Sequence, residues 1–497
     1  MKKFTKYFIC LLFAGTMSCN DAIDITQPGL LSADAAFQSV ADLNSGLLGS
    51  YRFLDVSTDI QFNAVFTDEV SIGFDSGGQW LGNGEYGFVL NPQSAASVAL
   101  WNNSYDALNS VTRLIEAAAN IEPTAAEQAT YNNILGQAHA LRAYTHFKLL
   151  SYLSPDLTNA GAPGVIILET TPGIEDRLPR NTTGETLASI DSDLTMAAGL
   201  LDPAGNGNTF IGPDFVTALR ARIAAYTQDY TTAATLAGQL LANYDLADRA
   251  QYEAMWDDND DTEVIFQLER TINDNYDGQG ATGSGFAGGW AGANFAFVNS
   301  TIDGSPYGEM SRTLFNIMDP ADIRTTVVVD ATSIISPDYQ NADNFQFDDI
   351  LVISKYPGSE GQPLMNNLKV FRASEMQLIL AEARAANGDL AGAATAIQEL
   401  RDARMGAATP ALNFASAAEA FGVILDERRV ELCYEGHRWL DLKRLGARAN
   451  RAIDRDPLDC AINGACNLAI SDHRMAALPI PLVELDANPN IEQNAGY

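Results

Sequence analysis

One stretch of this sequence occurs twice, and the repetition restricts much of the fold to paired helices. LRARIAAYTQDYTTAATLAGQLL, which starts at Leu219, aligns with ILAEARAANGDLAGAATAIQELR, which starts at Ile379, at an offset of 160 residues. Each copy has helix-forming residues on both sides of a short polar turn, and alanines stand where two helices would meet. The aligned positions are Ala221 with Ala381, Asp229 with Asp389, Tyr230 with Leu390, Ala233 with Ala393 and Ala234 with Ala394. The sequence therefore predicts two similar helical hairpins.

These hairpins resemble tetratricopeptide units, in which stacked helix pairs bury the apolar stripes that a single pair leaves exposed. Two fainter pairs lie at residues 100–153 and 416–446. We therefore predict a mainly α-helical fold with a tetratricopeptide-like hairpin scaffold. The scaffold segments are expected at about 32–54, 100–153, 186–244 and 373–446.

The stretch SAAEAFGVILDERRVELCYEGHRWLDLKRLG, residues 416–446, is predicted to form one long helix. Its apolar residues recur at three-, four- and seven-residue steps, which places them on one buried stripe. Opposite charges stand three residues apart on the other faces, so we interpret them as a solvated ladder of ion pairs. Gly436 indicates that another backbone passes close by. The ladder pairs Arg428 with Glu431, Glu435 with Arg438 and Arg438 with Asp441, and His437 is placed on the same helix surface.

Residues 56–97 and 257–370 lack helical periodicity and are predicted to form an irregular, loop-rich half that binds ligand. Residues 263–268 are predicted to form a strand, with further short strands at 325–329 and 350–353. Aromatic rings stack on the apolar faces of sugar rings, and amides and carboxylates pair with sugar hydroxyls. The candidate ligand-binding residues in these glycine-bearing regions are Asp75, Trp80, Asn83, Tyr86, Phe286, Trp290 and Tyr307. For the aromatic ones, packing in the core is the alternative.

Acidic residues outnumber basic ones by 63 to 30, which gives a formal charge of −33. Such a surface repels nucleic acid and anionic lipid headgroups, so no nucleic-acid partner is expected. It also favours a neutral ligand over a polyanionic one.

Motifs for catalysis or metal binding are missing from the sequence. It contains no Gly-x-Ser-x-Gly elbow, His-Glu-x-x-His helix or phosphate-binding loop. The four histidines are not clustered, so neither a metal centre nor another cofactor is expected. Residues 257–261, DDNDD, offer carboxylates to a structural calcium ion, but they lack the spacing of an EF-hand, and a solvated acidic turn is the better interpretation. We predict a binding protein rather than an enzyme.

Residues 1–18 have the pattern of a secretory leader, with Lys2, Lys3 and Lys6 ahead of a short apolar core. Cys19 follows at the position where a bacterial lipoprotein carries its lipid, and residues 19–31 are predicted to form a lipidated tether. A soluble secreted form is the alternative. No other run approaches the roughly 18 apolar residues that span a bilayer, so acyl chains are the only membrane attachment expected.

The other cysteines are expected to have structural roles. Cys460 and Cys466 flank the short loop AINGA, and an exported protein reaches an oxidising compartment. We therefore predict a disulfide between these two residues. Cys433 is predicted to be a buried thiol.

Two motifs near the C-terminus resemble the signature of the SusD/RagB family of outer-membrane nutrient-binding lipoproteins. The first is Glu427-Arg-Arg-x-Glu-Leu-x-x-Glu-Gly-x-Arg-x-x-Asp-Leu-x-Arg-x-Gly446. The second is a closing segment with Pro479-Ile-Pro481, Asn488-Pro489, Gln493-Asn494 and Gly496-Tyr497.

This resemblance implies one SusD-like domain over residues 32–497, anchored to the outer membrane by lipid and facing outward. It implies a TonB-dependent transporter of the SusC type as partner, to which the protein passes oligosaccharide or polysaccharide without cutting it. The helical repeats would contact the transporter, and the loop-rich regions would hold the glycan, for which a neutral β-glucan is favoured. A surface binder of peptides or another nutrient is the alternative, and an extracellular glycoside hydrolase is a more distant one.

Overall fold

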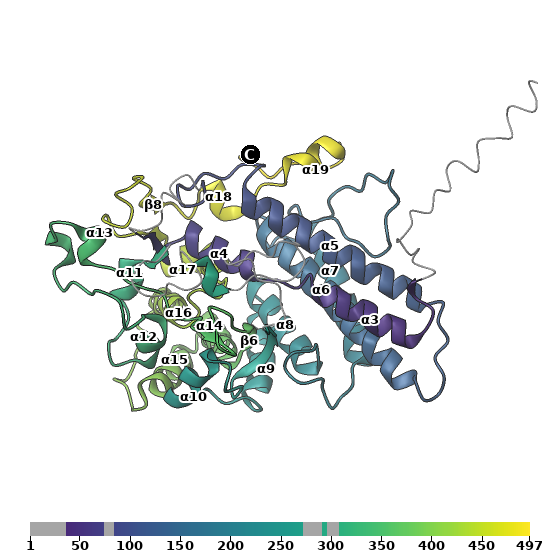
Figure 1. Cartoon of the computed structure of the whole chain (residues 1–497), viewed down its shortest axis with the longest axis horizontal. Helices are drawn as coiled ribbons and strands as arrows, with labels where there is room; N and C mark the ends of the chain where they lie inside the picture. The colour runs from purple at the N-terminus through teal and green to yellow at the C-terminus, as the bar shows by residue number, and fades with distance from the viewer. Residues whose placement is uncertain (1–35, 74–83, 272–290, 296–307) are drawn as a thin grey trace, which may run out of the picture.

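Helices are the main regular elements of the described protein, as the sequence predicts (Figure 1). The structure is a computed structural model that describes residues 36–73, 84–271, 291–295 and 308–497. Its longer helices are α3 Val40–Tyr51, α4 Ser57–Phe66, α5 Ala95–Ala118, α6 Gln128–Leu153, α7 Thr183–Leu200, α8 Pro213–Tyr226, α9 Tyr230–Leu241, α10 Arg249–Trp256, α14 Ala373–Ala386, α15 Leu390–Met405, α16 Ala417–Glu431 and α17 Arg438–Ala449. Short helices are α11 Arg312–Phe315, α12 Ile323–Val328, α13 Phe345–Asp348, α18 His473–Ala476, α19 Leu482–Ala487, η1 Ala291–Asn294 and η2 Tyr339–Asn341.

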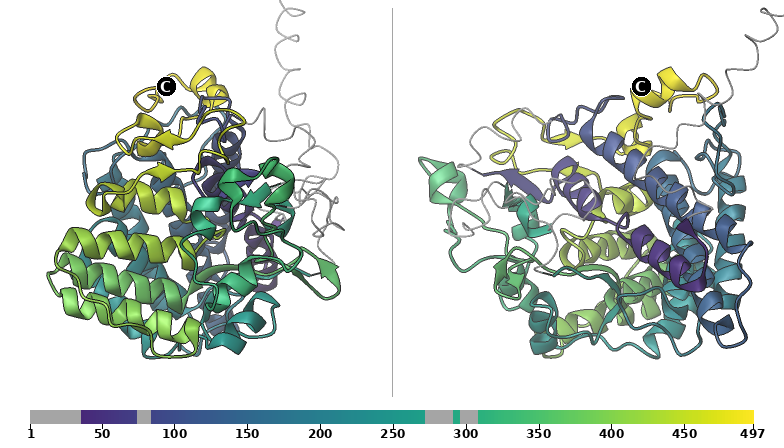
Figure 2. Two further views of the ribbon diagram at one scale, coloured as in Figure 1. Left: turned by 90° about the vertical axis from the view of Figure 1, so that its left-hand side faces the viewer. Right: turned by 45° about the vertical axis from the view of Figure 1, so that its right-hand side comes forward.

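The helical hairpins stack on one another to form the predicted scaffold. Within the pairs, α5 packs on α6, α8 on α9, and α14 on α15. Between the pairs, α14 contacts both α9 and α16, so the two repeated hairpins are direct neighbours. Figure 2 shows the yellow-green helices of the second repeat and of α16 lying in successive rows (Figure 2, left).

The two repeated hairpins turn in the same way. Asp229 and Asp389 begin the second helix of each pair, and their side chains accept hydrogen bonds from the backbone N–H groups of Thr232 and Gly392. The residue before each aspartate has a left-handed backbone, with φ 63° at Gln228 and φ 84° at Gly388. Glycine adopts this conformation at little cost and glutamine does not, so the first copy carries backbone strain that the second lacks.

Strands are short and occur in pairs. β2 Val264–Leu268 pairs with β6 Leu368–Arg372, which confirms the strand predicted at 263–268. The other pairs are β1 Val70–Ile72 with β3 Gly308–Met310, β4 Gly358–Ser359 with β5 Gln362–Pro363, and β7 Ile453–Asp454 with β8 Asn467–Leu468.

Two of the predicted strands are not formed. Residues 325–329 were expected to be extended, but most of them belong to the helix α12, which begins after Asp322. The Asp322 side chain accepts a hydrogen bond from the Arg324 N–H, and this N-cap outweighs the β-propensity of the valines that follow. Residues 350–353 make only isolated bridges, to Ile334, Glu309 and Val329.

The helix α4 lies in a region that was predicted to be a loop. Eight of its ten residues are buried, on every side of the helix. A helix covered on all faces has no polar stripe, which is why residues 57–66 lack the amphipathic periodicity of a surface helix. Polar Asn63 is accommodated because its amide donates to the Asp59 carbonyl and the Tyr152 hydroxyl, and its oxygen accepts from the Trp439 N–H.

The prediction of one long helix over residues 416–446 is wrong, because the chain breaks between α16 and α17. These two helices pack on each other, which confirms the fainter helix pair predicted for the same residues. At residues 432–437, Tyr434 has φ 60° and Gly436 has φ 84°, both of which end a right-handed helix. The predicted close approach at Gly436 is confirmed: a Cβ atom there would lie 3.3 Å from the Cβ of Asp59 in α4. We call residues 432–437 the helix break.

Buried apolar side chains form two clusters in the part of the chain that is described. One cluster includes Leu141, Phe215 and Val264, and the other includes Leu400 and Trp439. The helix break contributes to both, because Tyr434 belongs to the first cluster and Leu432 to the second. Within the described residues, no helix has both the length and the apolar character needed to cross a bilayer.

Candidate functional site

The strand pair β1–β3 joins the ends of two segments predicted to bind ligand. In its antiparallel register, Ile72 at the end of β1 lies opposite Gly308 at the start of β3. In the sequence, residues 74–83, which include Trp80, begin two positions after Ile72, and residues 296–307, which include Tyr307, directly precede Gly308; both segments lie outside the described residues. The described residues that flank these two segments, far apart in sequence, are therefore neighbours at one edge of the strand pair.

A third segment ends close to the same place. The Gly308 N–H donates to the Phe295 carbonyl over 3.0 Å, so residues 295 and 308 are held together. Residues 272–290, which include Trp290, lead directly into η1, just ahead of Phe295. Gly292 in η1 packs so tightly that a Cβ atom would lie 2.7 Å from the Tyr356 carbonyl oxygen. We call these ends, around β1, β3 and η1, the segment base.

Tyr434 in the helix break contacts the segment base at three points. Its hydroxyl donates to the Glu69 carbonyl over 3.0 Å, directly before β1. Its ring packs on Phe295 with 4.9 Å between centroids, and its carbonyl accepts from the Tyr356 hydroxyl over 2.8 Å. One residue thus contacts the chain on both sides of the site, which explains why its strained φ is retained.

Two arginines hold the chain immediately before β1. Arg438 donates to both carboxylate oxygens of Asp68, over 2.8 and 2.9 Å, and Arg429 donates to the Asp68 carbonyl. Burial alone would raise the pKa of Asp68, but Arg429 and Arg438 outweigh it, and the pKa lies well below its usual value. Asp68 is therefore ionised and tied to α16 and α17.

The neighbouring Glu69 is in the opposite state. Burial raises its pKa to about 8, because the attraction of Arg438 does not offset the loss of water and the repulsion of Asp68. Its carboxyl accepts the Tyr434 N–H over 3.4 Å. A neutral acid beside an ionised one limits the charge that is buried under β1.

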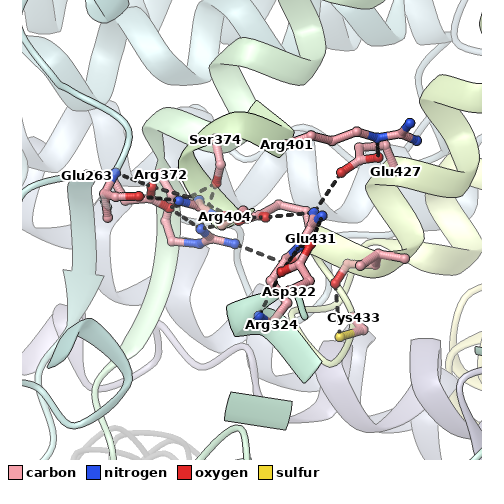
Figure 3. A network of polar contacts seen from close by, with 12 residues as sticks. Glu263, Asp322, Arg324, Arg372, Ser374, Arg401, Arg404, Glu427, Glu431 and Cys433 are labelled. Carbon is pink, nitrogen blue, oxygen red and sulfur yellow. Dashed lines mark hydrogen bonds and ion pairs between the residues drawn. The ribbon is translucent and has the colours of Figure 1, made fainter. Parts of the chain in front are cut away.

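A network of buried ion pairs surrounds Glu431 and Glu435, at the start of the helix break and within it (Figure 3). Arg372 pairs with Glu263, with Glu431 over 2.9 Å and with Glu435 over 2.7 Å. Arg404 joins Glu263 and Glu431, each over 2.9 Å. The network connects β6, α15, α16 and the residue that precedes β2, so it ties the loop-rich half to the helical scaffold.

The solvated ladder predicted for residues 416–446 is therefore wrong. Arg428 pairs across the break with Asp441 over 2.7 Å, Glu431 pairs with Arg372 and Arg404, and Arg438 pairs with Asp68. All of these side chains are buried, and so is His437, which was expected on the helix surface. Spacing of three residues could not reveal this, since the partners come from other elements.

Most of the candidate ligand-binding residues lie outside the described residues. These are Asp75, Trp80, Asn83, Phe286, Trp290 and Tyr307. Tyr86 is described and is fully buried: its hydroxyl donates to the Asp459 carbonyl over 2.9 Å, and the Arg455 guanidinium lies 4.0 Å from its ring centroid. Tyr86 therefore packs in the core, the alternative named for the aromatic residues, and we do not retain it as a ligand contact.

Arg455 holds Tyr86, which follows residues 74–83 in the sequence, against the end of α4. It donates to the carbonyls of Val65, Phe66 and Thr67 at the C-terminus of α4, and to the Tyr86 carbonyl. A cation is favourable at the C-terminal end of a helix, where carbonyls lack partners. Burial lowers the pKa of Arg455 to about 10, which still leaves the guanidinium charged at neutral pH.

The cysteines of the C-terminal half have the roles expected from the sequence. Cys460 and Cys466 form a disulfide with 5.2 Å between their Cα atoms. Cys433 is a buried free thiol, and burial raises its pKa to about 12, so it does not react as a thiolate. Cys19 lies outside the described residues.

Three of the four carboxylates in the acidic run at 257–261 have partners within the protein. Asp258 pairs with Lys369, Asp260 accepts the Thr262 N–H over 2.8 Å, and Asp261 accepts the Gln267 amide over 3.1 Å. No group of His, Cys, Asp and Glu in the described ranges has the arrangement of a metal site.

The helix break, rather than an aromatic residue, was the feature that sequence reasoning missed. Gly436 was the one signal, and it was interpreted as a close contact along a continuous helix. Tyr434 gave no signal, because a left-handed tyrosine has no sequence signature.

Comparison with known proteins gives a consistent result along the chain. A family model described as "SusD family" matches residues 253–497, and one described as "Starch-binding associating with outer membrane" matches residues 38–208. SusD-like protein P2 of Formosa agariphila is 26% identical over 540 aligned positions, which cover 100% of both chains. SusD-like protein P38 of the same organism is 23% identical, again over 100% of both.

Solved structures have the same fold. A SusD superfamily protein from Bacteroides thetaiotaomicron has a TM-score of 0.74 at 24% identity, over 92% of this chain and 100% of its own. A structure from Bacteroides vulgatus, described as a putative sugar binding protein, has a TM-score of 0.70 at 22% identity, over 93% and 99% of the two chains. With two successive family matches and relatives that align from end to end, the chain belongs to the SusD/RagB family.

Proposed function

We propose that this protein is a cell-surface lipoprotein that binds oligosaccharide or polysaccharide and passes it, uncut, to a TonB-dependent transporter of the SusC type. The observation that carries the proposal is the pairing of Ile72 with Gly308. Because of this pairing, the segments with Trp80 and Tyr307 start from one strand pair, and Trp290 leads into η1 beside it. Aromatic residues from separate parts of the chain can then contribute to one sugar-binding surface.

The names of related proteins support a carbohydrate as ligand. One matching family model carries the words "starch-binding", and one neighbouring structure is described as a SusD-like carbohydrate binding protein. The charge of −33 favours a neutral glycan such as a β-glucan over pectin or alginate, because an anionic polymer would be repelled.

Attachment and delivery complete the proposal. Lipid on Cys19 would hold the protein at the outer membrane, facing outward, with the helical hairpins against the transporter. Radiolabelled palmitate should be incorporated into the full-length protein expressed in a Bacteroidetes host and not into Cys19→Ala. Equal labelling of both proteins would show that Cys19 is not the lipidated residue.

Native gel electrophoresis through polysaccharides tests the ligand. Residues 20–497 should be retarded in a gel with laminarin, a neutral β-glucan, more than in gels with alginate or pectin. Trp80→Ala and Trp290→Ala should each raise the dissociation constant derived from the retardation about tenfold, since each removes a ring on which a sugar can stack. Phe210→Ala is the matched control, because Phe210 is an exposed aromatic residue on the scaffold.

Each outcome has a distinct meaning. Retardation that is unchanged by both tryptophan substitutions would show that Trp80 and Trp290 do not form the glycan-binding surface. Release of reducing sugar from the retained polymer would favour a hydrolase, and retardation in none of a broad panel of glycans would favour a peptide or another nutrient as ligand.

A further inference from the structure

An open groove lies between α7 and residues 154–182, the connector that joins α6 to α7. Its volume is about 690 Å³, within the range of about 300–1,000 Å³ that is typical of ligand-binding clefts. We call it the connector groove. In Figure 1, α7 lies right of centre, whereas α11, which follows β3, lies to the left, so the groove is separate from the segment base. Its apolar lining residues are Ile166, Ile167, Pro172, Leu178, Pro179 and Ala188.

Every charged side chain that lines the connector groove is acidic. These side chains are Glu169, Asp176 and Glu185, and all three residues are exposed. Neutral donors hold each carboxylate in place without cancelling its charge. Glu185 accepts from the Thr182 N–H over 2.8 Å, Asp176 from the Gly173 N–H over 2.6 Å, and Glu169 from the Ser189 hydroxyl over 3.1 Å. The groove therefore combines an apolar floor with fixed negative charge at its rim.

The connector wall of the groove is held by the rest of the protein. Asn488, in the closing segment of the chain, donates to the Leu178 carbonyl over 2.8 Å. In the turn beside the groove, the Asp176 N–H donates to the Gly173 carbonyl over 3.1 Å, and Ile174 within this turn is 95% exposed. A surface that is already ordered loses less conformational entropy when it binds a partner.

The lining of the connector groove selects among possible occupants. A sugar would find no aromatic ring to stack on among the described residues that line it, and an anion would be repelled. A second copy of this chain offers few cations. Of the described lysines and arginines, those exposed are Arg52, Arg113, Arg177 and Arg451. A polypeptide that carries both cationic and apolar side chains matches the rim and the floor.

We propose that the connector groove docks an extended segment of a second protein in which lysine or arginine alternates with apolar residues. Successive side chains of an extended segment point to opposite sides, so the apolar ones pack on the floor while the cations reach the acidic rim. Exposed ion pairs contribute little affinity, so the floor and Ile174 supply most of it and the charges supply selectivity. This interaction goes beyond glycan binding at the segment base and does not depend on it.

Fluorescence anisotropy with labelled peptides and residues 20–497 tests the chemistry of the occupant. The probe is a short peptide in which lysine and leucine alternate. One comparison peptide has serine in place of leucine, and another has glutamate in place of lysine. We expect the lysine–leucine peptide to bind about tenfold more tightly than either. Equal affinity for the lysine–serine peptide would overturn the proposal, because the apolar floor would then contribute nothing.

Two double variants locate the site. Glu169→Gln with Asp176→Asn should raise the dissociation constant of the lysine–leucine peptide about tenfold. The matched control is Glu253→Gln with Asp257→Asn, which removes the same charge from exposed residues at the end of α10 that do not line the groove. The control should raise the constant less than about twofold, through the weaker overall field. Equal effects would overturn the proposal, since only the net charge would then attract the peptide.

Cross-linking and glycan binding complete the test. A lysine–leucine peptide that carries a photoreactive benzophenone should cross-link within residues 166–192, and cross-links confined to other parts of the chain would overturn the proposal. Both double variants should be retarded by laminarin as strongly as the unsubstituted protein. Failure of the docking proposal is therefore distinguishable from failure of the glycan-binding proposal.

Discussion

Arg438 donates two hydrogen bonds to the carboxylate of Asp68, which stands 370 residues earlier in the chain. The pair joins the first turn of α17 to the residues that lead into β1. Both side chains are almost fully buried, with 4% and 1% exposed. The family signature near the C-terminus thus fixes the N-terminal edge of the segment base.

Removing the charge of Asp68 should destabilise the protein strongly. In Asp68→Asn, Arg429 and Arg438 would be left buried near each other without a carboxylate, which costs about 3–5 kcal/mol. The change should appear as a lower urea midpoint at an unchanged slope.

An exposed ion pair provides the control for Asp68→Asn. Asp426 pairs with Arg451 over 2.6 Å, but both side chains are about two-fifths exposed, at 38% and 40%. Asp426→Asn should cost less than about 1 kcal/mol. Equal losses for the two variants would mean that the Asp68 site is hydrated.

Asp459→Asn should stabilise the protein, and increasingly so as the pH rises. Burial, together with repulsion from Asp456 and Asp349, raises the pKa of Asp459 to about 7. In the unfolded chain the carboxyl ionises near its ordinary value, so the folded state loses stability as the pH rises from about 4 to 7. Asparagine keeps an oxygen that can accept the Arg312 N–H.

The expected gain for Asp459→Asn is up to about 4 kcal/mol at pH 8 and close to zero at pH 4. Denaturant titrations of both proteins at several pH values measure it. A gain that did not depend on pH would show that the carboxyl does not titrate in this range.

Acid should weaken the protein through His146. Burial lowers the pKa of this histidine to about 4, and its Nε2 accepts the Leu168 N–H over 3.1 Å. The unfolded chain takes up this proton near pH 6.5 and the folded protein only near pH 4, so stability falls across that window and not below it. The loss amounts to about 3 kcal/mol at most.

The variant His146→Gln isolates this effect. Glutamine offers an acceptor for the Leu168 N–H but takes up no proton, so the curve of stability against pH should be flatter between pH 6 and 4. An unchanged slope would assign the acid sensitivity to other groups, His437 among them.

The two repeated turns allow a reciprocal test of backbone strain. Gln228→Gly should stabilise the protein by about 0.5–1 kcal/mol, because glycine tolerates the left-handed φ at this exposed position. Gly388→Gln should destabilise it by a similar amount. Melting temperatures of the two variants check both, and shifts of the same sign would exclude the explanation.

Local and repeated patterns were well predicted from the sequence. Asp229 and Asp389 both begin a second hairpin helix, as their matched positions indicated. The disulfide between Cys460 and Cys466 and the strand β2 also lie within short stretches of sequence. Such features depend on residues a few positions apart, which periodicity and spacing report directly.

Predictions that depended on distant partners failed. Glu431 and Arg438 have the spacing of surface ion pairs, and only the fold shows that they are buried against Arg372, Arg404 and Asp68. Likewise, α4 has no amphipathic pattern because other elements cover all its sides. For a buried charge, the identity of its neighbours decides its role, and these neighbours come from elsewhere in the chain.

The amino-acid sequence alone determined that this chain contains a stack of alanine-lined helical hairpins, because helix and turn propensities act over a few residues. The tertiary structure alone decided that Ile72 meets Gly308 and that Arg438 meets Asp68. Contacts of this kind form only when the whole core packs, since burial makes a distant carboxylate the best available partner for an arginine that has lost its water.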